Sequence, residues 1–425
     1  MPRLQGVMQA VGCFIDIESG DMNLINHQRL VERFENQLRS LRLPIAVTWW
    51  DGRTALADGH TRIGLRVRDP RVLYSLVRPT LGRLARHYVE EQIDLEGDTR
   101  ELTRVGEALS GTPGTQRHTA MKWLGHSRLF DRKAIRYHYD VGDDFFGLWL
   151  DRRRVYSCAY FKTPEDTLEA AQEQKLDHIC RKLMLREGER FLDIGCGWGA
   201  LIQWAAEHYG VRATGITLSQ NQYDYARARI HEAGLDGRCE VRLLDYRDVP
   251  EDQPYDKIAS VGMFEHVGRR NFPVYFGKIR RLLREGGMVL NHGITLNAPE
   301  QDELGSDIGR FIDEYVFPGG ELSHVSRVMQ DMSAQGLECT DTESLRPHYA
   351  RTLWHWVDRL EANRAAAVQK VGEKAYRIWR IYMAGSAHAF ERGWMSIYQI
   401  LATRPRTDGR FVLPLTRDYM YNRNV

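Results

Sequence analysis

The chain has 425 residues, of which 43% are apolar and 27% are charged, a balance typical of globular proteins and unlike fibrous or disordered ones. Its 59 Lys and Arg nearly balance its 57 Asp and Glu, and a net charge of +2 excludes the uniformly basic surface of many nucleic-acid-binding proteins. No uncharged apolar stretch of about 18 residues occurs. The 6 cysteines show no close pairing and no CxxC spacing, which disfavours disulfides and a structural zinc site. We expect a cytoplasmic protein without a signal peptide, a membrane-spanning helix or a bound metal.

The first 110 residues predict a small α+β domain. Residues 7–20 and 43–70 are rich in Val, Ile, Thr and Trp and contain two Asp-Gly turn signals, which is typical of strands. Residues 71–92 read as helix with a break at Pro79, and residues 93–98 (IDLEGD) read as one more strand.

A Gly/Ser/Thr/Pro-rich stretch between Leu109 and Gly125 indicates a domain boundary. The segment that follows is basic, with six Lys or Arg and one acid between Arg117 and Arg136. We therefore divide the chain into an N-terminal α+β domain (1–115), a basic linker and cap (116–165) and a main domain (166–425).

From about residue 166 to residue 296, predicted helices and short apolar strands alternate. This alternation predicts an α/β fold with a parallel sheet covered by helices on both faces. The region after Pro299 reads as mostly helical.

The glycine-rich segment FLDIGCGWG at 191–199 follows the first strand of this region. Its GxGxG spacing differs from the GxGxxG of dinucleotide-binding folds and is that of S-adenosylmethionine (SAM)-dependent methyltransferases. Gly195 and Gly197 would leave room for the methionine part of the cofactor, and Asp193 would accept from its ammonium group. A turn with glycines for packing alone is the alternative. The loop positions expected at the cofactor are Asp193, Gly195, Cys196, Gly197, Trp198 and Gly199.

The next two strand ends carry further polar groups. Thr217 and Gln222 can meet a ribose, although the usual carboxylate is absent, and Asp245, Tyr246 and Arg247 can bracket an adenine. Because ligands of open α/β sheets bind at the carboxyl edge, three suitable strand ends in order predict SAM binding.

Eight ordered motifs resemble one family, the cyclopropane-fatty-acid synthases and related mycolic-acid methyltransferases. The resemblance spans roughly residues 130–400 and implies a class I (Rossmann-like) SAM methyltransferase domain with helical insertions behind the N-terminal α+β domain. The motifs are HYDVGDDFF (138–146), YSCAYF (156–161), LDIGCGWG (192–199), GITLSQNQ (215–222), SVGMFEHVG (260–268), NHGI (291–294), FIDEYVFPGG (311–320) and LRPHYARTL (345–353).

The resemblance implies methyl transfer from SAM to a cis double bond of an acyl chain, followed by closure of a cyclopropane ring with bound bicarbonate as the base. It places Tyr156 and Ser157 at the cofactor. It also implies a bicarbonate cage made of the backbone at Cys158, the side chains of Glu265 and His292, the backbone amide of Ile294 and the hydroxyl of Tyr349. Relatives often carry a cysteine where this chain has Ser386, which favours the bicarbonate mechanism over a catalytic thiol.

Similar synthases that act on phospholipids carry an N-terminal domain, so by this resemblance its presence here favours phospholipid acyl chains as substrates. The resemblance further implies a homodimer, and basic runs could attract an anionic bilayer, so we expect peripheral contact with the inner membrane surface and no nucleic-acid partner. A purely structural or dimerisation role for the N-terminal domain stays open. So do a methylene or methyl-branched product and a non-catalytic lipid-binding protein.

Overall fold

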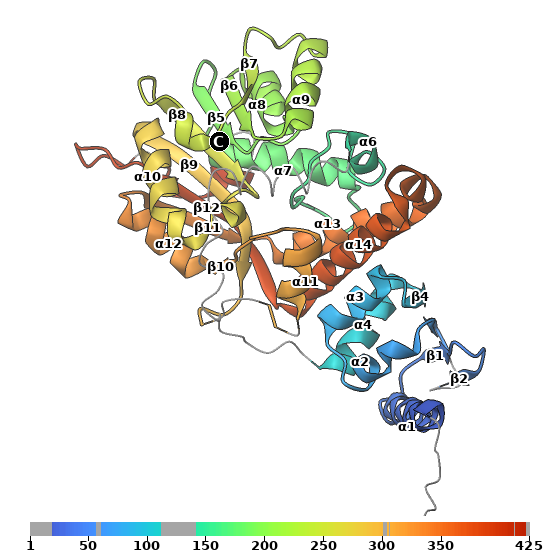
Figure 1. Ribbon diagram of the computed structural model, residues 1–425. Coiled ribbons are helices and arrows are strands. Elements are labelled where there is room, and N and C mark those ends of the chain that lie inside the picture. Colours follow the sequence, from blue (N-terminus) through green and yellow to red (C-terminus); the bar gives the residue numbers. More distant parts are fainter. Residues whose placement is uncertain are drawn as a thin grey trace, which may run out of the picture.

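The computed structural model describes residues 19–56, 61–111, 142–300, 304–305, 307–411 and 413–421. Two sheets organise these residues, one in an N-terminal module (the described part of 19–111) and one in a C-terminal module (the described part of 142–421). The N-terminal module lies against helices α11 and α14 of the C-terminal module, at the lower right of Figure 1. The stretch expected to hold the domain boundary, and the basic run between Arg117 and Arg136, fall mostly or wholly outside the described residues.

The N-terminal module has a four-stranded sheet of order β2-β1-β3-β4 within the described residues. The strands expected in 43–70 and 93–98 and the helix break at Pro79 are confirmed. The strand expected from residue 7 lies outside the described residues up to residue 18, and residues 19 and 20 begin a helix instead. The elements are β1 (Ile45–Thr48), β2 (Thr54–Leu56), β3 (Ile63–Val67), β4 (Ile93–Gly97), α1 (Ser19–Ser40), the 3₁₀ turn η1 (Pro70–Val72), α2 (Leu73–Val77), α3 (Leu81–Val89) and α4 (Thr99–Ser110).

The C-terminal module contains an eight-stranded sheet within the described residues, with seven strands in the order β11-β12-β9-β8-β5-β6-β7 and β10 paired to β9. Strands β9, β8, β5, β6 and β7 are parallel, which confirms the predicted α/β core. The strands are β5 (Arg190–Ile194), β6 (Arg212–Thr217), β7 (Cys239–Leu243), β8 (Tyr255–Val261), β9 (Leu283–Leu296), β10 (Ser323–His324), β11 (Glu338–Ser344) and β12 (Met395–Thr403).

Helices cover both faces of this sheet. Buried residues of α7, α8 and α9 pack on one face, and those of α10 and α12 pack on the other. The helices are α6 (Asp143–Phe146), α7 (Leu168–Lys182), α8 (Ala200–Tyr209), α9 (Gln220–Glu232), α10 (Phe272–Leu282), α11 (Ile308–Tyr315), α12 (Val325–Ala334), α13 (Arg346–Ala362), α14 (Arg364–Arg392) and α15 (Asp418–Tyr421), with 3₁₀ turns η3 (Tyr246–Asp248), η4 (Phe264–His266) and η5 (Arg269–Asn271).

The region after Pro299 is mostly helical, as expected, but it also adds strands that the sequence did not predict: β12 runs antiparallel to β9, and β11 runs antiparallel to β12. Strand β12 is buried along almost its whole length and mixes apolar residues with Ser396 and Gln399. It therefore lacks the apolar and polar alternation that marks a half-buried strand, and periodicity does not separate it from a buried helix. Strand β11 lies at the sheet edge and is largely polar, so it lacks the apolar alternation that marks a strand.

Two buried arginines of α14 join the modules. Arg377 donates to Asp94 Oδ1 at 2.7 Å and to the carbonyl oxygen of Tyr88 at 3.0 Å. Arg380 donates to Thr99 Oγ1 at 2.7 Å and to the Tyr88 hydroxyl at 3.0 Å. These charge-assisted hydrogen bonds fix α14 against the N-terminal module.

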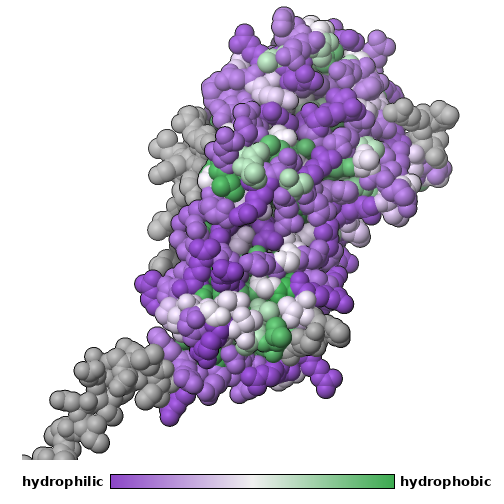
Figure 2. Space-filling view, turned by 90° about the vertical axis from the view of Figure 1, so that its right-hand side faces the viewer, coloured by the Kyte–Doolittle hydropathy of each residue, from purple (hydrophilic) through white to green (hydrophobic). Residues whose placement is uncertain are grey.

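No helix among the described residues is both long and apolar enough to cross a bilayer. On the face in Figure 2, hydrophobic residues form separate small patches within a mainly hydrophilic surface.

Candidate active site

A cavity of about 150 Å³ opens at the carboxyl ends of β5 and β6. Its lining contains twelve of the thirteen residues expected at the cofactor. Gly199 is the exception: it precedes α8 in a left-handed conformation, and an added Cβ would lie 3.0 Å from the Cβ of Ala226. The residues brought together are Tyr156, Ser157, Asp193, Gly195, Cys196, Gly197, Trp198, Thr217, Gln222, Asp245, Tyr246 and Arg247.

The turn after β5 needs glycine for two reasons. Gly195 has φ 81° and Gly197 has φ 54°, values that residues with a Cβ rarely adopt. A Cβ on Gly195 would also crowd Met263, whereas one on Gly197 would meet no atom within 4 Å, so the backbone there faces open space. A ligand can therefore approach this backbone closely.

Asp193 is buried at the end of β5, and its Oδ1 has no hydrogen-bond partner among the described residues. Burial raises the pKa of this carboxyl to about 7, against the opposing influence of Lys175. The buried Lys175 of α7 lines the same cavity and donates to Ser157 Oγ at 2.9 Å, and burial lowers its pKa to about 8. An unpartnered carboxylate oxygen in a lined cavity fits a ligand that brings a donor or a positive charge, as the amino acid part of SAM does.

The polar groups after β6 and β7 are held in place by one another. Thr217 Oγ1 donates to Gln222 Oε1 at 2.8 Å. Asp245 accepts from Arg247 Nε at 2.8 Å and from its Nη2 at 2.6 Å. These pairs fix the side chains that line the cavity on the side of β6 and β7, away from the glycine turn.

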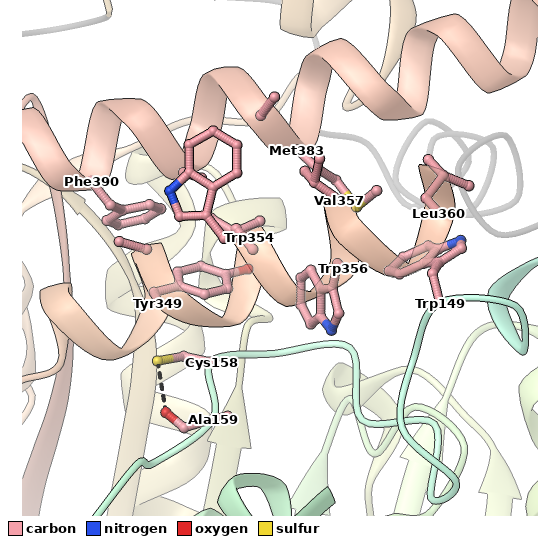
Figure 3. Packing of buried hydrophobic residues seen from close by; sticks show 14 of the residues in the cluster. Trp149, Cys158, Ala159, Tyr349, Trp354, Trp356, Val357, Leu360, Met383 and Phe390 are labelled. Carbon is pink, nitrogen blue, oxygen red and sulfur yellow. Dashed lines mark hydrogen bonds between the residues drawn. The ribbon is translucent and has the colours of Figure 1, made fainter. Parts of the chain in front are cut away.

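A second cavity, of about 120 Å³, adjoins the first and shares Tyr156, Ser157, Gly262 and His266 with it. All five positions of the expected cage line this second cavity, although they come from a loop, η4, β9 and α13. Figure 3 shows Tyr349 on α13 between the loop that carries Cys158 and Phe390 of α14. The five are Cys158, Glu265, His292, Ile294 and Tyr349.

Two of these side chains present buried polar atoms without a partner among the described residues, Glu265 Oε2 and His292 Nε2. Burial raises the pKa of Glu265 to about 7 and lowers the pKa of His292 well below its usual value. Gln399 Nε2 lies 3.3 Å from His292 Nδ1 and donates to it, which leaves the ring proton on Nε2. A neutral imidazole N–H and a carboxyl that is easily protonated fit a small anion with a hydroxyl of its own, as bicarbonate is.

The backbone amide of Ile294 was expected to bind bicarbonate, but in the structure it already has a protein partner. It donates to Glu265 Oε1 at 2.7 Å, so it orients the carboxyl. The Cys158 thiol donates to the carbonyl oxygen of Ala159 at 3.3 Å (Figure 3), and burial raises its pKa far above the ordinary value. A thiol that stays neutral is a poor nucleophile.

The rest of the second cavity is mainly apolar and aromatic, with five rings in its lining. Aromatic faces can stabilise a nearby cation and exclude water. Ser386 also lines this cavity, so the serine that replaces the relatives' cysteine lies at the site. The rings belong to Tyr156, Phe317, Tyr349, Tyr382 and Phe390.

Three residues of the site escaped the sequence analysis: Lys175, Gln399 and Tyr382. Lys175 lies in a helix of mixed polarity. Gln399 lies in a strand of the region that was expected to be mostly helical. Tyr382 lies one helical turn before Ser386, the residue of that helix that the sequence singled out. A buried lysine between apolar helix positions was the one available signal.

Comparison with known proteins gives consistent matches. Residues 126–400 match the family model described as mycolic acid cyclopropane synthetase. A probable fatty acid methyltransferase of Pseudomonas putida is 45% identical over 385 residues, which are 90% of this chain and 98% of the relative. Cyclopropane mycolic acid synthase 1 of Mycobacterium tuberculosis is 37% identical over 273 residues, which are 62% of this chain and 94% of the relative.

Among solved structures, mycolic acid cyclopropane synthase CmaA1 complexed with SAH and CTAB matches with a TM-score of 0.60 and 35% sequence identity. The match covers 64% of this chain and 98% of that structure.

Proposed function

The chain belongs to the mycolic acid cyclopropane synthetase family of SAM-dependent lipid methyltransferases, and from this premise we propose that it methylates the cis double bond of unsaturated phospholipid acyl chains and closes a cyclopropane ring. The observation that carries the proposal is the second cavity. It adjoins the SAM cavity and is lined by aromatic rings. It also contains Glu265 Oε2 and His292 Nε2, two buried polar atoms without a partner in the described part of the chain.

SAM supplies a methyl group on a positively charged sulfur. Asp193 and the glycine turn bind and orient that cofactor, and Lys175 positions Ser157 beside it. An alkene is a weak nucleophile, so the aromatic lining must hold it in line with the methyl group and keep water from the cation that forms on the chain.

Ring closure requires removal of a proton from the added methyl group. Bicarbonate held by Glu265, His292 and Tyr349 would supply the base there. Glu265 is oriented for this by the Ile294 amide, and His292 by Gln399. Because the Cys158 thiol stays neutral, it is not the base.

A second product class deserves the same test, a methylene chain formed by hydride shift and proton loss. A saturated methyl-branched chain would need, in addition, a hydride from an external reductant such as a reduced nicotinamide. The relative named as a fatty acid methyltransferase matches 90% of this chain, whereas the relative named as a cyclopropane synthase matches 62%. Both products need a base at the same place, so the cage serves either.

Membrane contact is part of the proposal, because the double bond lies inside a bilayer. The basic runs that the sequence offers for this are largely engaged within the described residues. Arg152 and Arg153 pair with Glu173, and Lys278 and Arg281 pair with Glu251. We propose a weak and reversible contact to which these side chains contribute little.

The test is mass spectrometry of vesicles of unsaturated phospholipid incubated with the protein and SAM. A gain of one CH₂ with loss of the double bond supports the cyclopropane product, and the same gain with a double bond retained supports the methylene product. A saturated methyl-branched chain, which gains two further hydrogens, would appear only when a reductant is added. No gain on any chain would overturn the proposal.

The cage is tested in the same assay with bicarbonate-depleted buffer and with His292→Gln and Tyr349→Phe. We expect turnover to fall by about 100-fold in the variants, as for loss of a positioned base, and wild-type turnover to recover when bicarbonate is added. Tyr74→Phe, at an exposed tyrosine of the N-terminal module, is the matched control. Unchanged turnover in both cage variants would refute the cage.

A further inference from the structure

A third cavity, of about 140 Å³, lies between the N-terminal module and helices α11 and α14. Its walls come from both modules. Ile45, Leu65 and Leu102 line it from the N-terminal side, and Phe311 and Ile381 line it from the C-terminal side.

Among the residues that the structure describes, the lining of this cavity contains no Lys, Arg, Asp or Glu. His388 belongs to it, but His388 Nε2 already lies 2.8 Å from Glu107 Oε2. A charged lipid head group placed here would lose its hydration without gaining a charged partner, which is unfavourable. The cavity therefore suits a hydrocarbon chain and excludes its polar end.

The third cavity meets the second one. Four residues line both of them: Ile312, Tyr382, Ser386 and Met395. The second cavity in turn adjoins the SAM cavity through Tyr156 and other shared residues. The three cavities therefore form a series from the cofactor site, past the cage, into the N-terminal module.

We propose that the methyl-terminal segment of the acyl chain, the part beyond the double bond, passes Tyr382 and Ser386 into the third cavity, so that the N-terminal module selects the length of that segment. This inference rests on the proposed function. The double bond must lie beside the cage and the head group must stay in contact with water. The methyl end is then the part of the lipid that reaches the deepest apolar space.

Gly385 gives a way to close this space. It is exposed although residues 383, 384 and 386–390 of the same helix are buried, it lines the third cavity, and a Cβ on it would meet no atom within 4 Å. Gly385→Phe places a ring in the cavity. The control Gly385→Ala adds only one methyl group, and alanine is a better helix former than glycine. From the opposite wall, Gly106→Leu narrows the same space. Gly106 lines the cavity, and a Cβ on it would lie 3.3 Å from the side chain of Leu81, another lining residue, and would press on it.

The experiment measures kcat/KM of the full chain with SAM and vesicles of phosphatidylglycerol in two series of acyl chains. In the first series the segment between the ester and the double bond is constant and the methyl-terminal segment lengthens. In the second series the methyl-terminal segment is constant and the segment between the ester and the double bond lengthens. We expect Gly385→Phe and Gly106→Leu to lose about tenfold or more on the longest chains of the first series relative to the shortest, as for a hydrophobic pocket that is too small. Gly385→Ala should follow the wild type.

A length-dependent loss in the second series would overturn the proposed direction of the chain. An equal loss on all chains in both variants, or no loss, would show that the third cavity is not on the path of the chain. Wild-type protein without turnover on any chain is a different result, because it overturns the proposed function and this inference with it. Circular dichroism and SAM binding of each variant identify loss of folding, and the two variants from opposite walls must agree for the inference to stand.

Discussion

The carboxyl of Glu265 should destabilise the protein at neutral pH. Its side chain is buried, one oxygen accepts from the Ile294 amide, and the other has no partner among the described residues. Glu265→Gln keeps the shape and the accepting oxygen but removes the ionisation. We therefore expect this variant to unfold less readily than the wild type above pH 7.

The size of the effect follows from the pKa. Burial raises the pKa of Glu265 from the ordinary 4.5 to about 7. Between these two pH values the folded protein binds more protons than the unfolded chain, so wild-type stability falls as pH rises through this window. At about 1.4 kcal/mol per pKa unit, ionisation costs about 3 kcal/mol above pH 7, and the cost is absent below about pH 4.

Urea unfolding in bicarbonate-free buffer at pH 4 and pH 8 measures the difference. We expect Glu265→Gln to match the wild type at pH 4 and to exceed its free energy of unfolding by about 3 kcal/mol at pH 8. Glu187→Gln, at an exposed position, is the control and should show no such gain. A variant that is equally stable or less stable at pH 8 would refute the reasoning about this site.

Two further predictions concern the cofactor site and the contact between the modules. Asp193→Asn should weaken SAM binding by about tenfold to 100-fold, because a hydrogen bond to a charged group is lost, and isothermal titration calorimetry measures this. Arg380→Met should lower the free energy of unfolding by about 1.5 to 3 kcal/mol, since Thr99 and the Tyr88 hydroxyl lose a buried donor while the partly exposed Glu361 keeps its hydrogen bond from Thr99; urea unfolding of the full chain tests it.

The order of elements from α7 to β9 could be predicted from the sequence, because helices and strands alternate there and most of the turns between them carry Gly or a helix-capping residue. Helix α1 was missed, since its buried contribution rests on few apolar residues such as Val31, Phe34 and Leu38. Strands β11 and β12 were missed because their pairing partners lie far away in the chain. Non-local pairing leaves little local trace in a sequence.

Local motifs identified most of the candidate site, because Asp193 and the glycine turn form one continuous segment. The cage residues were found through the resemblance, since Glu265, His292 and Tyr349 come from separate elements. The partner of the Ile294 amide could not be foreseen, because it depends on the distance between η4 and β9 in the folded chain.

Helix α14 carries Arg377 and Arg380 toward the N-terminal module and Tyr382 and Ser386 toward the site. A shortened chain without the N-terminal module would expose both guanidinium groups and the apolar wall beside them. Loss or gain of this module in evolution therefore requires coordinated substitutions along one helix. A grafting experiment that moves the module onto a one-domain relative must transplant the outward face of α14 as well.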